Sequence, residues 1–102
     1  MQRDRAMAEY LLLMHDDATV EATAWEGYIR ELVLSGVFRG GSAIGDGVCA
    51  RKDKGERPMT PHLSGFMRIE AESLEQARAV LAGNPVYEAG GTVEIRELPR
   101  SD

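Results

Sequence analysis

The chain has 102 residues, of which 43% are hydrophobic and 28% charged, a length and composition that fit one folded domain. Its formal net charge of −5 argues against nucleic acid as a partner, because the phosphate backbone requires a basic face. The single cysteine rules out an internal disulfide framework. The chain shows no signal-peptide pattern and no apolar stretch of membrane-spanning length, so we expect a cytoplasmic protein without a membrane partner.

The chain is predicted to begin with an extension and a central strand. Residues 1–8 contain a charged QRDR run without an apolar stretch and are expected to form a partly ordered N-terminal extension. A single domain then spans residues 9–99, and 100–102 form a tail. The apolar run YLLLM at Tyr10–Met14 is too short for a helix and predicts a strand buried on both faces.

A helix is predicted after this strand, followed by a glycine that ends it. Its N-cap is either Thr23, in a capping box with Glu26, or Thr19 if the helix begins one turn earlier. Gly36 is expected to end the helix, because glycine readily adopts the left-handed conformation found at helix C-termini. The helix is predicted from an apolar stripe at helical spacing, which consists of Trp25, Tyr28, Ile29, Leu32 and Val33.

Glycines divide the middle of the chain. Residues Val37–Ile44 predict a second strand interrupted by two glycines, and the following Gly-Asp-Gly turn leads into a small β-ribbon around Val48–Arg51. Within it, Cys49 has apolar neighbours, which favours a small buried side chain over a reactive one. The next segment is basic but interleaved with acids, which favours a solvated loop over an anion site; its cations are Arg51, Lys52, Lys54 and Arg57.

The C-terminal third predicts a strand, a capped helix, a turn and a last strand. Polar and apolar residues alternate over 65–71 and again over 92–98, the period-two pattern of strands with two unlike faces. Between them, Ser73 and Gln76 have the spacing of a capping box. Asn84-Pro85 then prevents the helix from continuing and reads as a turn.

Two strand-helix-strand units predict an α+β, ferredoxin-like βαββαβ fold, in which an antiparallel sheet carries both helices on one face. The first strand is expected to lie between the two C-terminal strands. The opposite, open face must be polar, cover a ligand or pack against a second copy. Residues expected to face the helices are Met67, Ile69, Val93 and Ile95. Those left on the open face are Phe66, Arg68, Glu70, Glu94 and Arg96.

The open-face charges have two interpretations. Enclosed charges are rarely left unpaired, so the arginines and glutamates could form salt bridges across the sheet or across a dimer interface. Alternatively, Arg68 or Arg96 could receive a ligand carboxylate, with Glu70 or Glu94 fixing its orientation. We therefore treat these residues, together with Phe66, as candidate ligand-binding positions.

Two histidines complete the candidate site. His15 ends the first strand, where it is either a polar strand terminus or a general acid or base. His62 precedes the third strand and is a candidate ligand-binding residue. Neither lies in an HxH or HxxxH spacing, so we expect no metal site and no cofactor.

Most of the chain resembles the YCII-related proteins, and within them the DGPF-type branch. The segments that carry the resemblance are YLLLMHDD, SGFMRIEAESLEQA and GGTVEIREL, in the family's order. The resemblance implies a homodimeric α+β barrel in which two ferredoxin-like sheets face each other around pockets. It implies no known activity.

The chain departs from the family's pattern at two places. Pro58–His62 replaces the Asp-Gly-Pro-Phe segment. Family relatives are thought to pair a histidine with an aspartate before the turn proline, whereas this chain has Asn84 there, and an amide cannot orient a histidine by charge.

Two hypotheses about function follow. In the first, the protein is a dimeric module of unassigned role that binds a small molecule, which could carry a carboxylate, or a protein partner between sheet faces. In the second, it is a small cofactor-independent enzyme of isomerase, lyase or hydrolase type. His15 would then be its acid or base, with Arg68 or Arg96 holding the anion.

Overall fold

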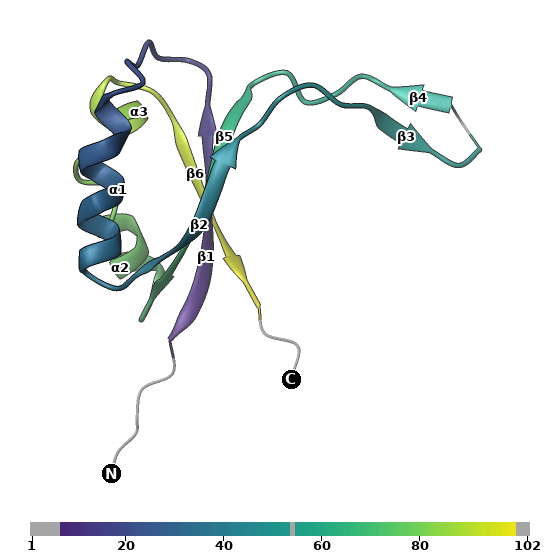
Figure 1. Ribbon diagram of the computed structural model, residues 1–102. Coiled ribbons are helices and arrows are strands. Elements are labelled where there is room, and N and C mark those ends of the chain that lie inside the picture. The colour runs from purple at the N-terminus through teal and green to yellow at the C-terminus, as the bar shows by residue number, and fades with distance from the viewer. Residues whose placement is uncertain (1–6, 54, 100–102) are drawn as a thin grey trace.

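The computed structural model describes residues 7–53 and 55–99, which form an antiparallel four-stranded sheet with three helices on one face (Figure 1). This α+β architecture is compatible with the predicted ferredoxin-like fold. The strand order is β2-β5-β1-β6, so the first strand lies between the two C-terminal strands as expected. The bounds are Ala8–His15 for β1, Phe38–Ala43 for β2, Leu63–Ala71 for β5 and Val93–Leu98 for β6.

Strand β1 is central but is not buried on both faces. Its Tyr10, Leu12 and Met14 are buried beneath the helices, whereas Leu11 and Leu13 are only half-buried on the open face. The prediction of two buried faces is therefore wrong for the single chain. The physical reason is that all three helices lie on the other side of the sheet (Figure 1).

Helix α1 (Ala24–Leu34) has the predicted phase over most of its length. Tyr28 and Leu32 are buried, and half-buried Trp25 packs edge-to-face on Tyr28. Val33 is an exception, since 55% of it is exposed. Thr23 stands at the N-cap but makes no side-chain capping bond, so the capping box with Glu26 is not formed.

Between β2 and β5 the chain leaves the sheet as a narrow two-stranded hairpin. Strands β3 (Cys49–Arg51) and β4 (Gly55–Arg57) pair with each other in an antiparallel manner. Cys49 is exposed, so the prediction of a buried cysteine is wrong. Its neighbours are apolar, but the hairpin stands away from the layer that would cover them (Figure 1).

The C-terminal unit contains one more helix than predicted. Helix α2 (Leu74–Ala79) is capped by Ser73, whose side chain accepts a hydrogen bond from the Gln76 amide at 3.1 Å. The turn predicted at Asn84-Pro85 is instead the start of a one-turn helix, α3 (Pro85–Glu88). The buried Asn84 side chain caps it by accepting from two backbone amides, at 3.0 and 3.1 Å.

The predicted N-terminal extension, apart from Met7 and Ala8, and the predicted tail lie outside the described residues. Strand β1 begins at Ala8, one residue before the predicted domain boundary. Among the helices described, none is long and apolar enough to cross a bilayer.

Candidate functional site

A pocket of about 420 Å³ lies between α1 and the end of the sheet where β1 finishes. This volume is within the range of small-molecule sites, which are mostly apolar with a few polar groups. The polar side chains around it are His15, Asp16, Ser42 and Ser64. Its apolar wall is formed by Met14, Trp25, Ile29, Phe38, Met67 and Val86.

Two glycines leave the floor of this pocket without side chains. Gly65 occupies a helix-facing position of β5, two residues before Met67, and Gly41 of β2 lies opposite Met67. A Cβ on Gly41 would come 2.5 Å from the carbonyl oxygen of Phe66, so β2 approaches β5 closely only because this residue is glycine. A Cβ on Gly65 would point toward Met14 Cε at 3.5 Å. Gly41 thus allows β2 to approach β5, and the missing side chain at Gly65 leaves room beside Met14 on the helix side of the sheet.

The loop after β1 forms another side of the pocket and is fastened to the start of β6. Asp17 accepts hydrogen bonds from the Thr92 amide at 2.9 Å and from the Thr92 hydroxyl at 2.6 Å. These bonds hold the pKa of the Asp17 carboxyl below its ordinary value of 3.8. A Cβ at Gly91 would lie within 2.9 Å of Val86, Ala18 and Asp17 atoms, so the loop packs directly on the backbone there.

His15 lies at the rim of the pocket, between it and the open face. Its Nε2 is buried with no hydrogen-bond partner among the described residues, and it lies 3.6 Å from Glu94 Oε1. That separation is within ion-pair range but beyond a direct hydrogen bond. The His15 ring also meets the His62 ring edge-on, with centroids 4.5 Å apart.

Glu94 connects His15 to the open face. Arg96 NH1 donates to Glu94 Oε2 at 3.1 Å. This arginine, followed by His15, holds the pKa of the Glu94 carboxyl below its ordinary value. A short series of charged and polar groups thus runs from Arg96 on the sheet surface to the pocket rim.

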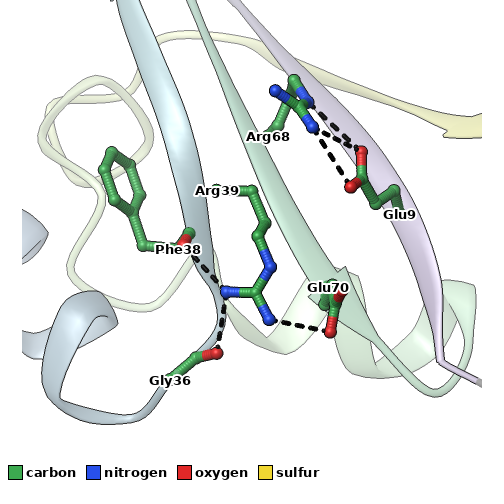
Figure 2. Close-up of polar contacts among 6 residues, drawn as sticks. All are labelled: Glu9, Gly36, Phe38, Arg39, Arg68 and Glu70. Carbon is green, nitrogen blue, oxygen red and sulfur yellow. Dashed lines mark hydrogen bonds and ion pairs between the residues drawn. The ribbon is translucent and has the colours of Figure 1, made fainter.

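The remaining open-face charges are paired across strands (Figure 2). Arg68 donates three hydrogen bonds to the Glu9 carboxylate at 3.1 to 3.2 Å, and Arg39 forms an ion pair with Glu70 at 2.9 Å. Glu9 and Arg39 were not among the predicted site residues. Their alternation on β1 and β2 could have indicated them, but the choice of partner depends on strand register.

The structure divides the predicted site residues into two groups. His15 and Phe66 are among the residues around the pocket, although Phe66 occupies a position of β5 that alternates away from the helices, and His62 contacts His15. The four charged positions lie instead in open-face ion pairs and do not line the pocket; they are Arg68, Glu70, Glu94 and Arg96. The pocket itself was missed, although a glycine at an inward position of an alternating strand was its signal.

Over the residues that the structure describes, no group of three or more His, Cys, Asp or Glu side chains is arranged to hold a metal ion. Comparison with known proteins adds no identity: no family model matches the chain, and no curated protein matches it.

Proposed function

We propose that the protein is a small YCII-like, DGPF-type module that lacks the DGPF segment itself, acts as a homodimer and binds a small molecule in the α1 pocket. The observation that carries this proposal is the pocket, which combines an apolar wall, a floor of two glycines and a polar rim at His15. A concave, mostly apolar lining with a few placed polar groups is the arrangement that small-molecule sites share.

The lining indicates the chemistry of the ligand. Trp25 and Phe38 offer aromatic surface, and Met14 and Met67 add thioethers that pack well against rings. Among the described residues that line the pocket there is no arginine or lysine, so His15 is the lining side chain whose ring N–H could donate to a ligand carboxylate. We therefore expect a largely apolar, ring-containing compound with one polar group, which could be a carboxylate, directed at His15.

Trp25 provides the test, because it is the only tryptophan in the chain and it lines the pocket. Its fluorescence is titrated with neutral aromatic compounds and with their carboxylate analogues. Val20 also lines the pocket, so Val20→Phe should fill it and weaken binding by about tenfold or more. Val33→Phe adds the same ring at an exposed position of α1 and should leave the affinity unchanged.

Saturable binding that Val20→Phe abolishes and Val33→Phe preserves supports the proposal. Binding that both variants retain would place the ligand elsewhere, for example between two sheet faces, and would overturn the assignment to this pocket.

The homodimer is proposed through the open face of the sheet. Leu11, Leu13 and Phe66 are half-buried there, and they form an apolar centre among the ion pairs. Such a patch on a small domain is commonly covered by a partner, and an isologous contact would cover it on both copies.

A second candidate function, a cofactor-independent enzyme, is favoured by one observation. His15 Nε2 lies at the pocket rim 3.6 Å from the Glu94 carboxylate, an arrangement that can orient an imidazole for proton transfer. Arg68 and Arg96, the anion holders expected from the sequence, already have glutamate partners. Compounds found by titration should be converted by the wild type and not by His15→Gln if the protein is an enzyme. Unchanged compounds with retained binding would support the module instead.

A further inference from the structure

The hairpin between β2 and β5 is a projecting arm, which we define as residues 44–62. It extends from the end of the sheet toward the side opposite the helices (Figure 1). Every side chain described in this range is exposed. They include apolar residues that are normally covered: Ile44 is 37% exposed, Met59 40% and Val48 70%.

The arm is not expected to be stable without a further packing partner. A two-stranded hairpin is marginally stable in water unless it packs against something, and β3 and β4 pair only with each other. The radius of gyration is 15.7 Å, compared with about 13 Å for a compact domain of this length. Apart from its base, where His62 contacts His15, the arm is therefore extended away from the core, and no other layer of the described residues covers its two strands.

The opposite edge of the same sheet carries an open groove. It lies between α2, α3 and β6 and has a volume of about 460 Å³. Its apolar lining consists of Leu74, Leu81, Tyr87, Val93 and Ile95, and Arg78, Gly91 and Thr92 complete it. Leu74 and Tyr87 are 57% and 48% exposed. Val93 and Ile95 face the helix layer and yet remain half-buried, so this layer does not reach the sheet edge.

We infer that the arm of one copy packs its apolar side chains into the β6-edge groove of a second copy. This inference rests on the proposed homodimer and is independent of what the pocket binds. If two open faces meet about a two-fold axis parallel to the strands, β2 of one copy lies opposite β6 of the other, because they are the two edges of one sheet.

The arm and the groove lie at the same end of the sheet. Gly65, near the base of the arm, and Val93, at the start of β6, both pair with Met14 of β1. The first half of the arm, Ile44–Arg51, would span about 26 Å if fully extended, whereas facing sheets pack about 10 Å apart. An arm of this length passes the sheet of the second copy and reaches the side of β6 where the groove lies.

Charge also favours a second copy as the occupant. The arm carries four cations and three acids, whereas the whole chain has a net charge of −5, so the rest of the chain is more acidic than the whole. A mildly basic arm is thus attracted in general to the acidic body of another copy, whereas the one charged side chain that lines the groove is Arg78, so the contact within the groove itself is an apolar one. If the two-fold axis instead ran across the strands, the arm would point toward exposed Leu34 at the end of α1. Neither the α1 pocket nor the β6-edge groove lies there.

The natural Cys49 makes the inference directly testable, because it is the only cysteine and lies exposed on the arm. Leu74→Cys places a second thiol in the groove, and Leu34→Cys places one at the alternative contact. With a short bismaleimide, Leu74→Cys should form covalent dimers much faster than the wild type or Leu34→Cys. Equal or faster crosslinking of Leu34→Cys would overturn the arrangement.

A second measurement uses the apolar contact itself. Val48→Asp should raise the dimer dissociation constant by about tenfold or more, as expected for loss of an interface anchor. The matched variant Leu34→Asp should leave it unchanged in sedimentation. A Val48→Asp dimer as tight as the wild type would refute the arm contact while leaving the open-face dimer standing. A wild-type protein that is monomeric at micromolar concentration would refute both the arm contact and the open-face dimer. The Trp25 titration would still test ligand binding in the pocket independently.

Discussion

Asp17 fixes the loop that forms one side of the pocket, through two hydrogen bonds to Thr92. Its pKa is lowered in the folded protein, so the stabilising contribution of the charged carboxylate is fully present above the ordinary value and is lost as the pH falls through the folded value. We expect the wild-type melting temperature to drop between about pH 5 and pH 2.5 more steeply than that of Asp17→Asn. Parallel melting curves for the two proteins would contradict this role.

The two floor glycines should respond differently to an added methyl group. At Gly41 the new Cβ would lie 2.5 Å from a backbone oxygen, so β2 must move; we expect Gly41→Ala to cost about 1 to 3 kcal/mol. At Gly65 the nearest atoms are at 3.2 and 3.5 Å, so Gly65→Ala should fold with a smaller loss and a narrower pocket. Urea denaturation compares the two, and equal losses would show that close approach at Gly41 is not the constraint.

At the scale of elements, Asn84 and Ser73 cap neighbouring helices in different surroundings. Ser73 is exposed and its cap is one hydrogen bond, so Ser73→Ala should cost about 1 kcal/mol. Asn84 is fully buried, and its side chain accepts two hydrogen bonds from backbone amides. Asn84→Ala should therefore lower the free energy of unfolding by about 2 to 4 kcal/mol, because two amides lose their partner inside the protein. Chemical denaturation with the Ser73 variant as control tests this, and similar losses would contradict it.

The strands and capped helix of the C-terminal unit could be predicted because their signals are local. Alternation over 65–71 and the Ser73 cap each act within a few residues. The exposure of Val33 and Cys49 could not be predicted, since apolar character says nothing about whether another layer lies above the residue. Helix α3 was missed because an Asn-Pro pair is as compatible with a turn as with an N-cap followed by proline.

The pocket and the ion pairs depend on register, which the sequence left open. Alternation correctly placed Phe66, Arg68 and Glu94 away from the helices, but it could not show that Arg68 meets Glu9. Likewise, Gly65 lies in the floor of the pocket because strand β2, with its own glycine at position 41, pairs beside it, and this pairing could not be read from the sequence. Sequence thus specified which face each residue occupies, while tertiary pairing determined its partners.

At the scale of the whole molecule, the open face should form the dimer. Leu13 lies between Phe66 and Glu94 in the register of the sheet, so Leu13→Lys would place a charge at the centre of the contact and should shift the protein to monomers in sedimentation. Val33→Lys, at an exposed position of α1, is the control. A Leu13→Lys protein that remains fully dimeric would place the interface elsewhere.

The open-face arginines should matter little to ligand binding in the pocket. Arg96 is paired with Glu94, its side chain is 66% exposed and it does not line the pocket. Arg96→Met should therefore leave the ligand affinity from Trp25 titration within about twofold of the wild type. A large loss of affinity for carboxylates alone would favour an anion site on the open face.

The most direct test of the pocket uses the methionine methyl groups as reporters. The chain has five methionines; Met14 and Met67 line the pocket, whereas Met59 lies on the arm. In spectra of protein labelled with ¹³C at the methionine methyls and assigned by Met→Leu variants, a bound aromatic compound should shift Met14 and Met67 and leave Met59 in place. Shifts confined to Met59, or none at Met14 and Met67 with any compound that binds, would contradict a ligand site between α1 and the sheet.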